Sequence, residues 1–349
     1  MDRTEFTQLD IDNVAKINVN RYCTFIIKND NTLWVTGYNS NGNLGLGDTT
    51  DRNIFTKVDI DNVKDISGGA GSSFIIKNDG TAYSCGSPIK SGGNYYQLGL
   101  GDNSSRNTFT KINISDVEKI YPCGDHTFLI KTDNTLWGVG NTDNGVLATT
   151  SSNGMYTTFK QLTYNTDNIK TLVANNNNAF IIKNDGSVWC TGKNSRGELG
   201  NGNEYSQYGF TKISNSLVYQ FLKTTKIRKV ILGGISTYLV MDDNTLWVAG
   251  YNGNGILGLG DTKQRNTFTK VDIDNVKDIF PYNGATLLIK NDNTLYGTGS
   301  FSGTQLNNLS SRKYFEQIDY ELPNFDDTIY GFSLDSINSL LKFNEFIKN

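Results

Sequence analysis

The chain has 349 residues, a formal net charge of −3 and 37% hydrophobic residues, a composition typical of a globular protein. Lys and Arg form no run, so we expect no surface that follows nucleic-acid phosphates and no nucleic-acid partner. No stretch approaches the roughly eighteen apolar residues of a membrane span. The N-terminal residues lack a basic region followed by an apolar run, so we also expect no secretion signal, no membrane insertion and synthesis in the cytoplasm.

The first residues already contain part of a repeated pattern. Phe6–Val14 is nearly identical in sequence to Phe55–Val63 and to Phe268–Val276. The chain therefore begins near the end of a repeat, and Phe6–Leu9 is predicted to be a last strand with no earlier strands of its own.

The first complete unit begins at Phe25. Two runs of β-branched and aromatic residues, Phe25–Lys28 and Thr32–Thr36, are separated by Asn29–Asn31, residues that tolerate the positive φ of a tight turn. This pattern predicts a β-hairpin that spans twelve residues from Phe25 to Gly37. The same spacing recurs five times, between Phe74 and Gly86, Phe128 and Gly140, Phe180 and Gly192, Tyr238 and Gly250, and Leu287 and Gly299.

Each hairpin is followed by two further anchors. The Leu of a Leu-Gly motif lies seven residues after the last Gly of the hairpin in five copies, and twelve residues after it only between Gly86 and Leu98, where we predict an insertion. A Phe-Thr-Lys strand follows, and the basic period is 49 residues. A period near fifty with four short strands is typical of a β-propeller blade. A continuous array favours a single ring-shaped domain over residues 1–349.

The end of the chain is predicted to complete the ring. Ser339–Ile347 resembles the hairpin at Thr286–Tyr296 and stops before the parts that the N-terminus supplies. We therefore expect a seven-bladed, all-β propeller whose last blade is closed by the N- and C-terminal strands, which removes the exposed sheet edge. The alternative is a terminal helix over residues 325–349, because Ser336–Phe343 also has helical spacing.

The loops of such a propeller fall on two chemically different faces. One face carries regular Lys-Asn-Asp turns and Asp-Ile-Asp-Asn loops, and the other carries loops that vary from blade to blade and are rich in Tyr, Asn, Ser and Gly. Variable loops of this composition on a rigid scaffold resemble an antibody paratope. The candidate ligand-binding residues are therefore tyrosines of the variable face: Tyr38, Tyr95, Tyr96, Tyr205, Tyr208, Tyr251 and Tyr282.

No residue pattern predicts catalysis. His126 is the only histidine, and the equivalent positions of the other copies supply no partner for a general base. Those positions hold Cys23, Ser72, Asn178, Ser236 and Ala285. We therefore interpret His126 as a structural residue and predict no catalytic residue.

Metal and cofactor sites are not predicted either. The Gly-Leu-Gly-Asp loops place an Arg four residues after Asp48, Asp102 and Asp261, and a cation beside the carboxylate favours an ion pair over calcium. The four cysteines form no Cys-x-x-Cys pair and are interpreted as reduced, structural thiols. The four tryptophans occupy one column of the repeat, which indicates packing within the blades rather than stacking platforms.

The repeats resemble those of the regulator of chromosome condensation (RCC1) family. The resemblance lies in the Asp-Asn or Asp-Gly turn, the Leu-Trp-x-x-Gly strand and the Asn-x-x-Gly-x-Leu-Gly-x-Gly loop. That loop is clearest at Tyr38–Gly47, Asn194–Gly202 and Tyr251–Gly260, and it weakens at Val146–Ala148 and Gln305–Asn307. The resemblance implies a seven-bladed propeller that acts by binding, as in a nucleotide-exchange factor for a small GTPase or a secreted β-lactamase inhibitor.

Two functions are consistent with these observations. The first is a non-enzymatic recognition module of a bacterial virus tail or bacteriocin-like particle that binds a protein or glycan of a bacterial cell surface, together with other tail or baseplate proteins. Related repeats in bacteria with A+T-rich genomes and in their phages support this hypothesis, because the chain is rich in Asn, Lys, Ile and Tyr. The alternative is an intracellular protein–protein interaction propeller, similar to an exchange factor or an inhibitor.

Overall fold

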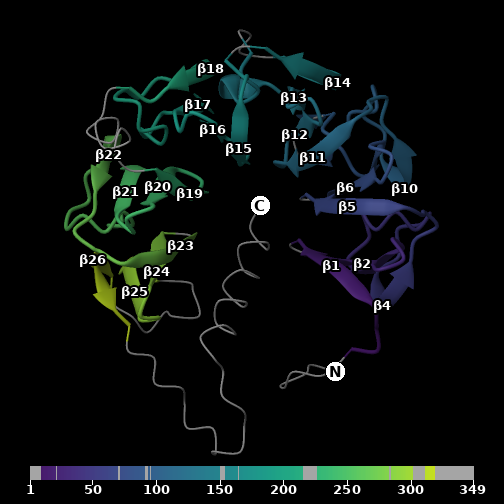
Figure 1. Ribbon diagram of the computed structural model, residues 1–349, viewed down its shortest axis with the longest axis horizontal. Helices are drawn as coiled ribbons and strands as arrows, with labels where there is room; N and C mark the ends of the chain where they lie inside the picture. The colour runs from purple at the N-terminus through teal and green to yellow at the C-terminus, as the bar shows by residue number, and fades with distance from the viewer. Residues whose placement is uncertain are drawn as a thin grey trace, which may run out of the picture. The chain divides into compact units, whose positions relative to one another are not determined.

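The computed structural model describes residues 9–20, 22–69, 71–90, 93–94, 96–149, 154–163, 165–214, 226–282, 284–301 and 311–318. The chain divides into two compact units. The first contains the described residues up to Asn141 and also Met155–Gln161, and the second contains Thr142–Gly154 and the described residues from Leu162 onward. Each unit contains three four-stranded antiparallel sheets (Figure 1). The prediction of a single domain stays a prediction.

The first unit contains three sheets and a short ribbon. The first sheet consists of β1 (Val14–Val19), β2 (Cys23–Lys28), β3 (Leu33–Gly37) and β4 (Arg52–Lys57). The second consists of β5 (Val63–Gly68), β6 (Ser72–Lys77), β7 (Ala82–Gly86) and β10 (Arg106–Lys111). The predicted insertion contains the ribbon of β8 (Ile89–Lys90) and β9 (Gly93–Asn94). The third consists of β11 (Val117–Pro122), β12 (His126–Lys131), β13 (Leu136–Asn141) and β14 (Met155–Leu162).

The second unit repeats the same strand order three times. A short 3-10 turn, η1 (Asp143–Gly145), precedes its sheets. Its first sheet consists of β15 (Ile169–Ala174), β16 (Asn178–Lys183), β17 (Val188–Gly192) and β18 (Gln207–Lys212). The next consists of β19 (Ile227–Leu232), β20 (Ser236–Met241), β21 (Leu246–Gly250) and β22 (Arg265–Lys270). The last consists of β23 (Val276–Tyr282), β24 (Ala285–Lys290), β25 (Leu295–Gly299) and β26 (Arg312–Gln317).

Each sheet is built around the hairpin that the sequence predicts. In the first sheet, Phe25 pairs with Val35 and Ile26 pairs with Trp34. The connecting turn places Asn31 at a φ of 62°, in the left-handed region that asparagine tolerates better than most residues. The hairpin prediction is therefore confirmed.

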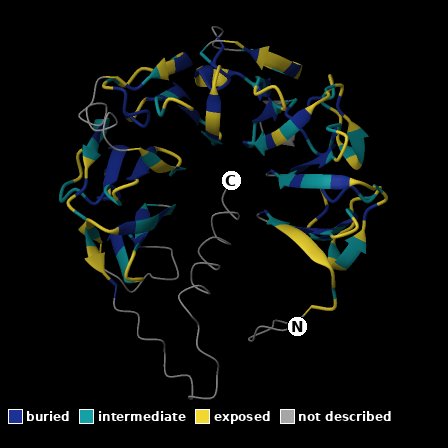
Figure 2. Cartoon of the chain, viewed as in Figure 1, coloured by how far each residue is buried: buried dark blue, intermediate teal, exposed yellow. Residues whose placement is uncertain are grey.

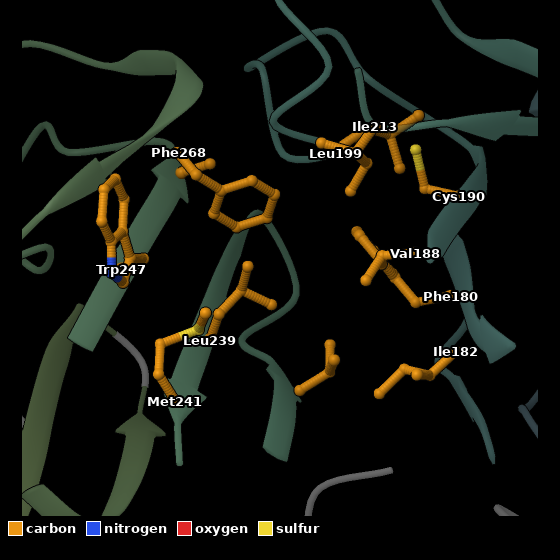
Figure 3. Close-up of a cluster of buried hydrophobic side chains, with 12 residues drawn as sticks. Phe180, Ile182, Val188, Cys190, Leu199, Ile213, Leu239, Met241, Trp247 and Phe268 are labelled. Atoms are coloured by element: carbon orange, nitrogen blue, oxygen red, sulfur yellow. The ribbon is translucent and has the colours of Figure 1, made fainter. Parts of the chain in front are cut away.

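The hydrophobic core lies in layers between consecutive sheets of the same unit. Figure 3 shows one layer of the second unit, in which Val188 and Cys190 of β17 face Leu239 and Met241 of β20. The inner strands are thus buried on both faces, which explains their nearly continuous apolar sequences. The fourth strand of a sheet carries many exposed residues, as β14 and β26 show in yellow (Figure 2).

The Leu-Gly motif connects one sheet to the next. Gly200 has a φ of +62°, and a Cβ added there would lie 2.3 Å from the ring of Phe268, a residue of the following sheet. Gly45 makes the same close approach to Phe109, with 2.5 Å from an added Cβ to the ring. Both the backbone conformation and the space require glycine, so the motif is a structural device of the array.

The predicted number of blades needs a correction. The described residues form six four-stranded sheets and not the seven that the sequence predicts. Phe6 and the segment 339–347, which were predicted to contribute to the seventh blade, lie outside the described residues, as does the alternative helix over 325–349. Within the part of the chain that the structure describes, no helix is long and apolar enough to span a bilayer.

Candidate functional site

Each sheet has two ends with different loops. We call "loop end" the side with the loops that join the first strand to the second and the third to the fourth, and "turn end" the opposite side. In the first sheet, the amide of Tyr38 donates a hydrogen bond of 3.0 Å to the carbonyl of Tyr22, and the two rings lie 5.6 Å apart. Tyr22 and Tyr38 are 56% and 42% exposed. The two kinds of variable loop therefore meet at the same end of the sheet, as the sequence predicts.

The turn end repeats one set of contacts. The ammonium group of Lys28 lies 4.7 Å from the centre of the Trp34 ring and 2.9 Å from a carboxylate oxygen of Asp12. In the second unit, Lys183 repeats the ring contact with Trp189 at 4.6 Å. The hairpin of Trp247 has no lysine at the equivalent position, and this tryptophan is buried in the core. These contacts confirm that the tryptophan column packs within the blades.

The hairpin turns at this end are also alike. In the first, the carboxylate of Asp30 accepts hydrogen bonds from the hydroxyl of Thr32 at 2.7 Å and from its amide at 3.0 Å. These bonds hold the pKa of Asp30 below its ordinary value of 3.8. The pKa values of the aspartates in four other hairpin turns are lowered by the same kind of bond: Asp79, Asp133, Asp185 and Asp292.

The aspartates of the Gly-Leu-Gly-Asp loops are paired with arginines. Arg52 lies 2.7 Å from the carboxylate of Asp48, and its hydrogen bond lowers the pKa of that group. The same pair occurs between Asp261 and Arg265, at 2.8 Å. The ion-pair interpretation is confirmed. In the described ranges, no group of three or more His, Cys, Asp or Glu side chains is arranged to hold a metal ion.

His126 and the cysteines are core residues. His126 is 1% exposed, and its ring packs edge-on against Phe128 with 5.3 Å between the ring centres. Burial raises the pKa of the Cys23 thiol to about 11 and that of Cys123 to about 12. All four cysteines are buried and free, as expected for structural thiols.

The candidate tyrosines differ in their surroundings. Tyr205 is 79% exposed and Tyr208 is 41% exposed, whereas Tyr96 is half-buried and has a positive φ of 54°. Tyr95 lies outside the described residues. The structure brings Tyr251 and Tyr282 to one hollow of the second unit, together with residues that the sequence did not single out.

That hollow is a pocket with a volume of about 430 Å³ at the loop end of two consecutive sheets, β19–β22 and β23–β26. Its lining residues are Gly233, Gly234, Ile235, Ser236, Tyr238, Tyr251, Asn254, Ile256, Pro281, Tyr282, Gly284 and Ala285. None of these side chains is charged. The pocket therefore presents an aliphatic and aromatic surface with hydroxyl and amide groups at a few points.

We call "floor" the most buried lining residues of the pocket, Tyr238, Ser236, Ala285 and Ile256, and the hydroxyl of Tyr238 is already satisfied. Tyr238 is fully buried, and its hydroxyl lies 2.9 Å from the Thr286 hydroxyl and 3.1 Å from the Ile256 carbonyl. Burial raises the pKa of Tyr238, so the group stays neutral. The floor consequently favours an uncharged group. A sequence search for tyrosines could find Tyr251 and Tyr282, but the floor residue Ile256 carries no signal other than its column in the repeat.

These features define the chain as a repeat protein built from four-stranded antiparallel β-blades. A family model, the regulator of chromosome condensation (RCC1) repeat, matches residues 169–198. The X-linked retinitis pigmentosa GTPase regulators of dog and human are 25% and 26% identical over 146 residues, which is 42% of this chain and 14% of each relative. The chain thus matches only a small part of these relatives.

Solved structures share the fold over most of the chain. The complex of Kap60 with yeast RCC1 (Prp20) contains a chain that matches with a TM-score of 0.69 and 13% identity, over 88% of this chain and 75% of the other. Prp20p from Saccharomyces cerevisiae gives 0.68 and 14% over 88% and 77%. Human WBSCR16 gives 0.62 and 18% over 78% and 72%. The chain is thus similar to RCC1 repeat proteins, and identities this low establish a shared fold without a shared activity.

Proposed function

We propose that this protein is a non-enzymatic protein-binding module that contacts its partner with the loop end of its blades. The observation that carries the proposal is the uncharged pocket of about 430 Å³, which two of the predicted tyrosines line. Tyrosine offers a large, rigid and amphipathic contact surface at a low cost in conformational entropy. The turn end supports the proposal by contrast, because its side chains are engaged in the same contacts from blade to blade.

The comparisons favour the interaction-propeller alternative over the virus-tail hypothesis. Two similar proteins are named as GTPase regulators, and the yeast structures concern Kap60 and binding to Gsp1p and histones. None of the comparisons supports a tail, a baseplate or a cell-surface receptor. We therefore infer a protein as the partner, in the manner of an exchange factor or an inhibitor, and we keep a glycan as an outcome to be tested.

The test compares matched sets of substitutions at the two ends. Proteins that bind the wild-type chain are captured from the source cells, and the binding of each is then measured for two variants. In the loop-end variant, alanine replaces Tyr95, Tyr96 and Tyr251. In the turn-end variant, asparagine replaces Asp59, Asp61, Asp272 and Asp274. Loss of anchoring aromatic side chains is expected to weaken binding about thirtyfold, roughly 2 kcal/mol, and the turn-end variant to bind normally.

Circular dichroism and thermal melting establish that both variants are folded. If the turn-end variant loses the partner while the loop-end variant still binds it, the turn end is the binding surface. Activity that depends on His126 in a stably folded protein would contradict the non-enzymatic part of the proposal.

We further propose a seventh blade, shared between residues 6–9 and 339–347, that covers the outer face of β1. Val14 and Ile17 of β1 are 38% and 62% exposed, whereas the equivalent Val63 and Ile66 of β5 are buried. An apolar strand face of this kind is normally covered. Deleting residues 1–12 should lower the melting temperature by several degrees, because losing an edge-closing strand costs a few kcal/mol in a large domain. An unchanged melting curve would contradict a shared blade.

A further inference from the structure

The pocket forms where two positions of the repeat meet, one from each of two consecutive sheets. We call the residues at one such position in all copies a column. The residue before the Leu-Gly pair is Asn43, Gln97, Val146 or Glu198 in the first four sheets, and Ile256 in the fifth. The residue that opens the second strand of each sheet is Cys23, Ser72, His126, Asn178 or Ser236, and Ala285 in the sixth. Ile256 and Ala285 belong to consecutive sheets and both line the pocket. The apolar side chain of Ile256 therefore faces Ala285, the smallest side chain of its own column, and this combination leaves an apolar hollow.

The equivalent place one sheet earlier is different. Glu198 stands where Ile256 stands in the pocket, it is 1% exposed, and its carboxylate accepts a hydrogen bond of 2.6 Å from the amide of Arg196. A buried carboxylate in this column would disfavour an apolar ligand. The hollow beside Ile256 is therefore suited to an apolar group in a way that the place beside Glu198 is not.

One wall of the pocket is fixed by a close contact. A Cβ added to Gly253 would lie 1.9 Å from the hydroxyl oxygen of Tyr251, so the tyrosine lies directly against the glycine. The guanidinium of Arg196, an exposed residue, lies 5.7 Å from the centre of the same ring. Tyr251 thus lines the apolar hollow and also lies close to a positive charge.

That positive charge has no carboxylate partner among the residues that the structure describes. The arginines of the Gly-Leu-Gly-Asp loops, such as Arg265, are paired at 2.8 Å, but Arg196 takes part in no ion pair of the described chain. The pocket lining contributes no carboxylate either. An unpaired guanidinium at the rim of an apolar pocket is complementary to an acidic group placed next to an apolar one.

We propose that this pocket receives a large apolar side chain from an acidic segment of a protein partner, and that Arg196 pairs with a carboxylate next to that side chain. The inference rests on the proposed function and adds the chemistry of the partner. The apolar side chain lies on Ile256 and Ala285 and contacts the rings of Tyr251 and Tyr282. The carboxylate remains outside the pocket, because the uncharged floor would not stabilise it.

The experiment uses the full chain and a random peptide library displayed on yeast cells. Peptides enriched on the wild-type protein are synthesised with a fluorescent label, and their affinities are measured by anisotropy. We expect enriched peptides to contain Phe, Leu or Met beside Asp or Glu. Replacing that apolar residue by alanine should weaken binding about tenfold or more.

Three substitutions assign the site, and one controls for charge. Ala285→Asn fills the pocket with asparagine, the residue that the fold already accepts at the equivalent position 178. It should lower the affinity for the peptides about tenfold or more. Gly253→Ala displaces the Tyr251 ring and should act in the same direction. Arg196→Glu should weaken the acidic peptides several-fold, whereas Lys170→Glu, an equal charge change on an exposed residue of β15, should not.

The outcomes separate this inference from the proposed function. If enriched peptides are insensitive to Ala285→Asn and Gly253→Ala but are lost when Tyr22 and Tyr38 are replaced, the loop end binds proteins and the pocket assignment is wrong. Enrichment of basic peptides, or no enrichment, overturns the inference. Binding on a glycan array that Ala285→Asn abolishes would overturn both, because the ligand would then be a glycan.

Discussion

The two ends of the blades differ in how uniform their contacts are. At the turn end, an aspartate accepts bonds from the threonine two residues later in one hairpin after another, and a lysine covers the aromatic ring of the next strand. At the loop end, neighbouring sheets carry different side chains at equivalent positions, such as Glu198 and Ile256. The contacts that build a blade are thus repeated from copy to copy, whereas the side chains of the loop end, where we propose that a partner binds, differ between copies.

The largest expected effect concerns the core that both ends share. Phe180 is fully buried between sheets of the second unit. Phe180→Ala should lower the free energy of unfolding by about 3–5 kcal/mol, because it removes a buried ring and leaves a cavity. Urea denaturation measures this loss. Tyr205→Ala, at a position that is 79% exposed, is the control and should change stability by no more than about 0.5 kcal/mol. Equal effects would contradict the division into core and variable loops.

A pair of substitutions with opposite signs tests the Leu-Gly contact. Gly200→Ala should destabilise the protein by about 2 kcal/mol, because its φ of +62° is costly for alanine and the new Cβ meets Phe268. Ala148 occupies the equivalent position with a φ of 53°. Ala148→Gly should therefore raise stability by about 1 kcal/mol. Thermal and urea unfolding give both values, and a stabilising Gly200→Ala would refute this role of the motif.

Acid should weaken the turn end. The pKa values of Asp30, Asp79, Asp133, Asp185 and Asp292 are lowered in the folded protein by hydrogen bonds from the neighbouring Thr or Ser. A lowered pKa contributes stability that is fully present above the ordinary value of 3.8 and is lost as the pH falls through the lower folded value. The urea midpoint should therefore decline below that pH. Asparagine at all five positions should flatten this decline, and an unchanged pH profile would argue against it.

The smallest expected effect on binding is at His126. The residue lies in the core, 1% exposed, and we assign it no contact with a partner. His126→Ala should leave the affinity for the captured partner or selected peptides unchanged within about twofold, even if the melting temperature falls. Anisotropy measured well below the melting temperature separates the two effects. A large loss of affinity there would mean that the uniform parts of the blades also carry recognition.

The repeat made much of the fold predictable. The spacing of Phe25 and Gly37 and the Asn31 turn are local signals, and the pairing of Asp48 with Arg52 follows from two residues of one loop. The insertion before Leu98 was also visible as a break in the spacing. Such features could be predicted because they depend on residues that are close in the sequence.

The pocket could be predicted only in part. Tyr251 and Tyr282 stand out by residue type, but Ile256 and Ala285 matter because consecutive repeats bring different columns together. No local pattern states which columns meet. The side chain of Arg196 was likewise missed, since its position over Tyr251 depends on the packing of neighbouring sheets. The seventh blade is not among the six sheets of the described residues, and it is kept only as a proposal, because the segments predicted to form it lie outside those residues.

The most direct test of the division between the two ends is amide hydrogen exchange, measured by mass spectrometry on the full chain with and without a saturating partner or selected peptide. We predict slower exchange on binding at residues 233–236, 251–256 and 281–285, and no change in the turns at 28–32 and 58–62. Protection confined to those turns, with the pocket segments unchanged, would contradict the account.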